Sequence, residues 1–227
     1  MIETQLKEVL KDLPEGVRLV AVSKFHPIEQ LIEAYDAGQR CFGENHAQEL
    51  AAKAPLMPPD VEWHFIGHLQ TNKVKQVVPY ANMIQSVDSL RLLQEINRQA
   101  IRFNRKISCL LQIHVAEEDT KFGFTTDELF TMLEAGEWRN LTNVHLCGIM
   151  CMATNTDDIA RIRKDFHHAR DVFEIVKKRF FYDDPTFCER SMGMSDDYPI
   201  AIEEGATLVR IGTRIFGARD YQRNQED

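Results

Sequence analysis

Lys24 is the first residue in the chain whose type and position could support covalent chemistry. It follows an apolar run at residues 17–22, which has the length of a strand. A lysine at a buried strand end lies near low-dielectric walls, where burial disfavours the charged amine and leaves more of it able to attack an aldehyde. Position alone favours a more ordinary alternative, a solvated lysine at the start of a loop.

Two glycine-containing stretches near the carboxyl end, residues 191–195 and 209–217, could bind a phosphate group. Gly212 would let backbone N–H groups approach an anion closely, and Thr213 would open a short helix whose N-terminus favours negative charge. Ser195 would add a hydroxyl donor. Two tight turns without a ligand are the alternative, but both stretches follow the last two predicted strands, which favours the phosphate.

Several histidines raise the question of a metal site. His46 and His68 each follow a predicted strand, but no carboxylates accompany them at a recognisable ligand spacing, so no metal is expected. His64 alternates with Trp63 and Phe65 within a strand, where a hydrogen-bonded core histidine is the commoner outcome. The sequence therefore predicts no metal centre.

The five cysteines are an odd number and contain no Cys-x-x-Cys pair. Cys147 and Cys151 have three residues between them and no second pair of ligands nearby. Buried, reduced thiols are the expected state, because free cysteine packs like a small hydrophobic residue.

A further stretch, residues 121–124 (KFGF), follows the fifth predicted strand. It could close over the mouth of a site, or it could be a loop held by its two phenylalanines. The sequence favours neither alternative.

The elements that must position these residues alternate between apolar runs and helical stripes along the whole chain. The predicted strands cover residues 17–22, 41–42, 63–66, 83–87, 107–115, 144–150, 187–189 and 207–211. Helices are predicted at the N-terminus, from residues 28, 47, 71 and 88, after the capping-box pair Thr125 and Glu128, over 159–176, where Ile159 begins the apolar stripe, and over 199–204. In the helix from residue 88, Phe103 is expected on the apolar face.

Eight such strands in 227 residues predict an α/β fold, a single (β/α)₈ TIM barrel near its minimum size. Continuous apolar strands are typical of a parallel sheet that is buried on both faces. An open doubly wound sheet is the alternative, but the Gly-x-Gly-x-x-Gly stretch expected after its first strand is missing. We expect one domain over residues 1–227, with its core at about 17–217, because the sequence shows no linker.

The composition narrows the class of protein. A net charge of −8 argues against a broad nucleic-acid-binding face, though not against a small basic pocket. No apolar run approaches the ~20 residues that span a bilayer. The N-terminus is an amphipathic helix pattern without the features of a signal peptide, so a cytoplasmic protein is expected.

Taken together, these residues resemble one family, the pyridoxal phosphate homeostasis proteins of the YggS/PROSC type. The resemblance covers residues 17–217 and rests on six stretches: residues 21–24 (AVSK), 42–45 (FGEN), 63–73 (WHFIGHLQTNK), 121–123 (KFG), 191–195 (SMGMS) and 209–217 (VRIGTRIFG). One departure is Phe25-His26-Pro27, where the family more often has Thr-Lys-Pro.

The resemblance implies a barrel like the N-terminal domain of alanine racemase, without that enzyme's second, β-rich domain. It implies that pyridoxal 5′-phosphate (PLP) is held as an internal aldimine on Lys24. The other implied contacts are Arg210 facing the pyridine nitrogen, Ser195 with the backbone of Gly212 and Thr213 on the phosphate, and Asn45, His64 and Met150 lining the ring pocket.

The function implied by the resemblance is PLP (vitamin B6) homeostasis without robust catalysis, in a monomer. PLP-dependent apoenzymes or PLP-producing enzymes are the implied partners, with no nucleic acid and no membrane. One alternative is a small amino-acid racemase that uses the same site. A second is a Schiff-base aldolase, in which Lys24 would attack a phosphorylated sugar without a cofactor.

Overall fold

The structure, a computed structural model, describes residues 1–116 and 122–217. Eight parallel strands close into a barrel in chain order, and the last strand pairs with the first. The strands are β1 (Arg18–Val22), β2 (Cys41–Glu44), β3 (Glu62–Phe65), β4 (Met83–Val87), β5 (Ile107–Gln112), β6 (Val144–Met150), β7 (Glu189–Ser191) and β8 (Leu208–Ile211). The predicted (β/α)₈ barrel is confirmed.

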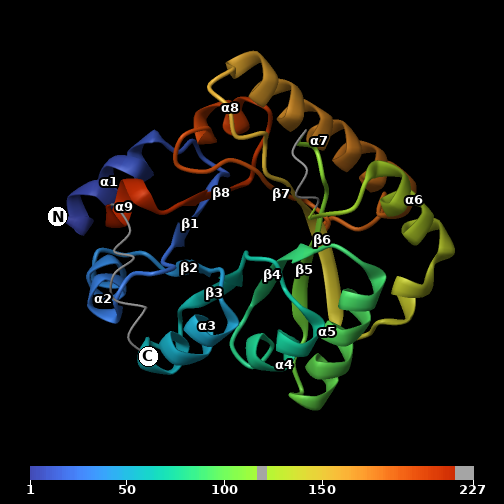
Figure 1. The fold of residues 1–227 in the computed structure, drawn as a ribbon, viewed down its shortest axis with the longest axis horizontal. Coiled ribbons are helices and arrows are strands. Elements are labelled where there is room, and N and C mark those ends of the chain that lie inside the picture. The colour runs from blue at the N-terminus through green and yellow to red at the C-terminus, as the bar shows by residue number, and fades with distance from the viewer. Residues whose placement is uncertain (117–121, 218–227) are drawn as a thin grey trace.

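Helices surround the barrel, as Figure 1 shows in a view down the molecule's shortest axis. They are α1 (Ile2–Asp12), α2 (Ile28–Asp36), α3 (Ala47–Lys53), α4 (Val74–Val77), α5 (Leu90–Arg102), α6 (Thr126–Ala135), α7 (Ile159–Phe180), α8 (Tyr198–Glu203) and α9 (Thr213–Phe216). Short 3₁₀ turns lie at η1 (Ala54–Leu56), η2 (Thr71–Lys73) and η3 (Glu137–Asn140). Across the described part of the chain, every helix is too short or too polar to cross a membrane.

Local capping explains where several helices begin. Thr125 and Glu128 form the predicted capping box, in which each side chain binds the backbone N–H of the other residue. The start of α5 differs from the prediction by two residues. The helix begins at Leu90, because the hydroxyl of Ser89 accepts from the N–H of Leu92 and caps it.

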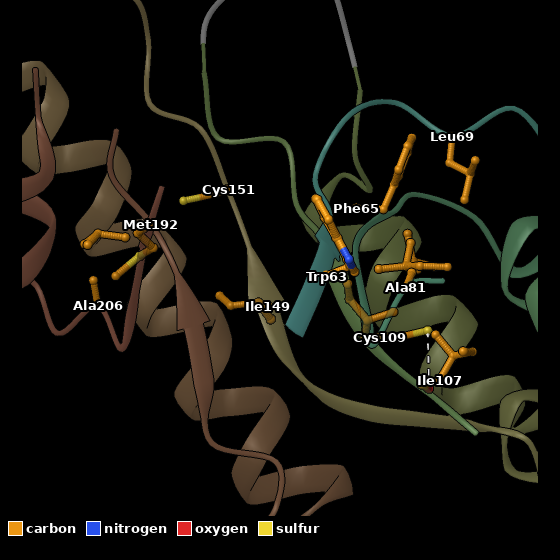
Figure 2. Packing of buried hydrophobic residues seen from close by; sticks show 14 of the residues in the cluster. Trp63, Phe65, Leu69, Ala81, Ile107, Cys109, Ile149, Cys151, Met192 and Ala206 are labelled. Atoms are coloured by element: carbon orange, nitrogen blue, oxygen red, sulfur yellow. Dashed lines mark hydrogen bonds between the residues drawn. The ribbon is translucent and has the colours of Figure 1, made fainter. Parts of the chain in front are cut away.

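The strands separate two apolar regions. The larger fills the space between strands and helices, where Trp63, Phe65, Leu69 and Ala81 pack together (Figure 2). The smaller contains only strand residues and lies inside the barrel, because side chains alternate between the two faces of a strand. Its members are Val20, Met83, Leu110, Cys147, Met150 and Leu208.

Further details of the prediction are wrong, among them the end of β5, which lies at Gln112 and not at residue 115. β7 begins at Glu189, and Phe187 instead packs outside the barrel with its ring 4.1 Å from that of Phe181. Polar residues fill β7, so hydrophobicity misplaced it. Phe103 and Ile159, expected on apolar helix faces, are 40% and 61% exposed. Both lie at helix ends, where one side of the residue faces solvent.

Candidate functional site

A cavity of about 230 Å³ opens at the carboxyl ends of the strands. Its walls come from residues that follow β1, β2, β3, β6, β7 and β8. They are Val22, Lys24, His26, Asn45, Ile66, Met152, Met194, Ser195, Asp196, Arg210, Gly212 and Thr213. In (β/α)₈ barrels the active site lies at this end.

Six of the eight predicted site residues line this cavity: Lys24, Asn45, Ser195, Arg210, Gly212 and Thr213. The other two, His64 and Met150, are buried inside the barrel and are absent from its described lining. Met150 belongs to the interior apolar cluster. Their contact with a ring in the cavity therefore stays a prediction.

The backbone beside Lys24 is strained. Phe25 has a φ of 65°, a left-handed conformation that costs a bulky residue about 1–3 kcal/mol. Its N–H donates to Oε1 of Glu49 at 2.6 Å, which helps to hold the turn. The Phe25 ring also lies 5.2 Å from that of His46. The turn after Lys24 is thus fixed by contacts from α3 and its N-cap.

A buried ionic cluster lies behind Lys24. Nζ of Lys53 donates to the carbonyl oxygen of Ser23 at 2.8 Å, to Glu44 at 2.9 Å and to Glu49 at 2.7 Å. The hydroxyl of Ser23 also donates to Glu44 at 2.7 Å. Glu49 also accepts from the N–H of Phe25. The cluster therefore binds the peptide groups on both sides of Lys24, through the carbonyl oxygen of Ser23 and the N–H of Phe25.

Glu44 is the most deeply buried acid of this cluster, with no exposed surface. Burial raises its pKa to about 7, although the ammonium of Lys53 acts in the opposite direction. Its second oxygen accepts no hydrogen bond from any described residue. The stability of the wall that carries Lys24 therefore depends on the charges of Glu44 and Lys53.

The neighbouring wall, which follows β7 and β8, depends on backbone packing. Gly193 has a φ of 87°, and a Cβ there would lie 2.6 Å from that of Ala201. Gly212 has an ordinary φ, but its Cβ would lie 3.0 Å from the carbonyl oxygen of Val22. Glycine at 212 thus lets the end of β8 approach the end of β1, while the Gly212 N–H points to Oγ of Ser195 at 3.4 Å.

Arg210 forms the floor of the cavity and is 4% exposed. Its guanidinium donates to Oγ of Ser191 at 2.6 Å and to the carbonyl oxygen of Cys151 at 2.8 Å. Burial lowers its pKa, yet arginine keeps its charge because its ordinary pKa is so high. The cavity therefore has a rigid, permanently cationic floor.

The described part of the loop after β5 contacts the loop after β3. Lys121 lies outside the described residues, but the ring of Phe122 lies 4.2 Å from that of His68, after β3. Phe124 is buried and anchors the loop. These contacts fit the alternative of a loop held by its two phenylalanines, while closure over the mouth stays a prediction.

Six residues of the lining were not predicted as site residues: Val22, His26, Ile66, Met152, Met194 and Asp196. The ring of His26 lies 5.0 Å from that of Phe216, and its Nδ1 is 2.9 Å from Oε1 of Gln30. Each of the six lies within or close to a predicted strand or a recognised stretch, and that position is the one signal that could have pointed to it.

The cysteines within the described ranges are all free thiols. Burial raises the pKa of Cys147 and of Cys151 to about 12, as expected of inert core thiols. Among the described residues, one group of three side chains that could hold a metal ion was not predicted: Cys41, Glu62 and His64 have their ligand atoms within 4.8 Å of one another. It lies at the amino ends of β2 and β3, away from the cavity.

The chain matches one family model and several named relatives. The model of the family described as alanine racemase, N-terminal domain, matches residues 1–220. A pyridoxal phosphate homeostasis protein from Pasteurella multocida is 39% identical over 214 residues, covering 92% of this chain and 90% of the relative. The chain belongs to the pyridoxal phosphate homeostasis protein family. An Escherichia coli member is 38% identical over 217 residues, covering 92% and 89%. The names of these members state homeostasis and no enzymatic activity.

Two solved structures extend the comparison. PipY of Synechococcus elongatus, solved with PLP bound, is 36% identical with a TM-score of 0.88, covering 96% of this chain and all (100%) of PipY. Alanine racemase of Clostridium difficile has a TM-score of 0.78 at 14% identity, and only 56% of it is covered. The racemase likeness shows the fold alone.

Proposed function

We propose that this protein binds PLP at the barrel mouth through a Schiff base on Lys24, and that it serves PLP homeostasis without efficient turnover of amino acids. One observation carries the proposal: Lys24, Arg210 and the Ser195–Thr213 side of the cavity face one space of about 230 Å³. When bound, PLP supplies an aldehyde that condenses with a primary amine to form an imine and water.

The residues present fit such a group. Oδ1 of Asn45 is buried on the cavity wall and accepts no hydrogen bond from a described residue, so a polar atom of a ligand can satisfy it. The cavity also combines a cation, an amine and hydroxyl donors, which match the ring nitrogen, aldehyde and phosphate of PLP.

The phosphate is assigned to Ser195 and to the backbone N–H groups of Gly212 and Thr213. The Gly212 N–H donates to Oγ of Ser195 at 3.4 Å, so these two groups lie together on the wall to which the phosphate is assigned. Arg210 would face the pyridine nitrogen. Arginine can only donate, so this contact would keep the nitrogen unprotonated and the ring a weaker sink for a carbanion.

Arginine at the ring does not by itself prevent catalysis. Racemisation also needs an acid and a base on opposite faces of the substrate. Lys24 can serve one face, but no tyrosine occurs among the described residues that line the cavity. Tyr198 is buried elsewhere, with its hydroxyl held by Arg214 at 2.6 Å and by Asp12 at 3.2 Å. His26 and Asp196 remain as the other titratable groups of the lining.

Two measurements test the proposal against its alternatives. The purified, PLP-loaded protein should absorb in the visible, whereas an aldolase lysine would not. The second measurement is α-proton exchange of L-alanine in D₂O, followed by NMR, with free PLP as the control. We expect no exchange beyond that control; exchange on the order of 1 s⁻¹ or faster would establish a racemase-type enzyme instead.

A further inference from the structure

A chain of hydrogen bonds runs through the barrel interior below the cavity. Arg210 donates to Oγ of Ser191 at 2.6 Å, and Ser191 lies 2.6 Å from Oε1 of Gln85. Nε2 of Gln85 lies 2.8 Å from Nδ1 of His64, and Nε2 of His64 lies 2.8 Å from Oε1 of Glu62. Glu62 is the first residue of β3, so the chain spans the interior from the amino end to the cavity floor.

The two ends fix the direction of every bond in this chain. A guanidinium can only donate and a carboxylate can only accept. Because Glu62 can only accept, His64 carries its proton on Nε2 and donates it to Glu62, which leaves Nδ1 to accept from the Gln85 amide. Oε1 of Gln85 then faces Ser191, whose hydroxyl donates to it and accepts from Arg210.

Burial makes this order hard to reverse. His64, Gln85 and Ser191 have no exposed surface, so any group left unpaired among them loses a hydrogen bond without gaining water. Turning the Gln85 amide over would place its NH₂ group beside Ser191, which already accepts from Arg210. It would also set the amide oxygen against Nδ1 of His64, so that two acceptors would face each other. Only Glu62, whose side chain is 37% exposed, reaches the surface.

We propose that Glu62 is a positioning residue for the cofactor: acting through His64, Gln85 and Ser191, it holds the guanidinium of Arg210 in the orientation that meets the ring. The proposal rests on the proposed function for its effect on PLP, but the hydrogen-bond order itself is a property of the protein without PLP. In this account the carboxylate is the terminal acceptor of a hydrogen-bond chain that begins at a buried arginine.

The surroundings of Glu62 support this role and supply a control. The hydrogen bond from His64 is the main cause that lowers the pKa of Glu62. Arg18 of β1 faces it at 3.6 Å and Cys41 of β2 lies nearby. Arg18 also binds Glu189 of β7 at 2.8 Å. Glu189 therefore shares this end of the barrel and this arginine with Glu62, but it lies outside the chain.

The test compares Glu62→Leu, Glu62→Gln and Glu189→Leu with the parent protein. Leucine removes the acceptor and fills the space that water would take, whereas glutamine keeps an oxygen that can accept. Imidazole ¹⁵N NMR of the protein without PLP, assigned with His64→Gln, reports which nitrogen of His64 carries the proton. Equilibrium binding then gives the PLP dissociation constant of each protein.

We expect the parent and Glu62→Gln to show His64 protonated on Nε2 alone, and Glu62→Leu to lose this pattern. PLP affinity should fall about two- to tenfold in Glu62→Leu, and it should change little in Glu62→Gln and in Glu189→Leu. If Glu62→Leu does not fold, Gln85→Met breaks the chain at its middle and should give the same loss of affinity.

An unchanged His64 pattern in Glu62→Leu would overturn the proposal, as would equal losses of affinity in Glu62→Leu and Glu189→Leu. So would stoichiometric zinc in the parent that is lost in Cys41→Ser, since a metal would take the Nε2 atom of His64. Failure of the parent to bind PLP at all would instead refute the proposed function, while the NMR result would still report on the chain.

Discussion

The two walls of the cavity are built by different means. The wall that carries Lys24 is held from behind by buried charges, with Lys53 bound to Glu44 and Glu49. The wall that carries Ser195 and Gly212 is held by close backbone approach. It follows that pH and charge should affect the amine side of the site, whereas side-chain size should affect the phosphate side.

Lys53→Met gives the largest expected effect. Removing the ammonium leaves Glu44 buried without its counter-charge, which should lower the free energy of unfolding by about 3–5 kcal/mol near neutral pH. Urea denaturation measures this loss, and Lys75→Met, at an exposed lysine, should stay within about 0.5 kcal/mol of the parent. A loss as small as that of Lys75→Met would mean that the ionic cluster does not hold this wall.

The raised pKa of Glu44 predicts a dependence of stability on pH. Its folded-state pKa of about 7 lies above its ordinary value of 4.5, so the folded protein binds the extra proton between these values. The contribution of Glu44 is then fully present at acid pH and is lost as pH rises through about 7, by on the order of 3 kcal/mol.

Glu44→Gln should flatten that part of the stability curve, measured by urea denaturation at several pH values between 4.5 and 8. The Lys53→Met loss should also shrink at the acid end, where Glu44 becomes neutral. A curve of the same slope in Glu44→Gln would assign the dependence to other groups.

Ser195→Ala tests the phosphate side of the cavity through the ligand. A hydrogen bond to a charged group contributes about 1.5–3 kcal/mol, so PLP affinity should fall by roughly one to two decades. Pyridoxal lacks the phosphate and should lose much less. Equal losses for the two ligands would show that the hydroxyl has another role.

Gly212→Ala should have the smallest effect of the set. The added methyl group meets the backbone of Val22 at 3.0 Å, and such crowding costs about 1–3 kcal/mol of unfolding free energy. The loss should be the same at acid and neutral pH, unlike that of Lys53→Met. A loss that varied with pH would contradict the division between the two walls.

The sequence was enough to predict the barrel and most of the cavity, because both depend on local patterns. β4 and β6 occur at the predicted residues, because apolar residues begin and end both strands, Met83 and Val87 in β4 and Val144 and Met150 in β6. β7 was misplaced because Glu189 and Arg190 are polar and make their contacts with residues far along the chain.

The parts that could not be predicted depend on which side chains meet in space. The Glu49–Lys53 pair has the spacing of an ordinary exposed helix pair, and nothing in it indicates burial against Ser23. Gln85 and Ser191 are separated by 106 residues, so their link between His64 and Arg210 has no local signal.

The central claim, that Lys24 is the amine that holds PLP, is tested most directly by borohydride reduction of the PLP-loaded protein followed by peptide mass spectrometry. Lys53 is the internal control, because it is also buried behind this wall but is bound to two carboxylates. We expect the pyridoxyl group on Lys24 alone, and no trapped PLP in Lys24→Ala. A label on Lys53 or on any other lysine, together with a Lys24→Ala protein that is still yellow, would contradict the claim.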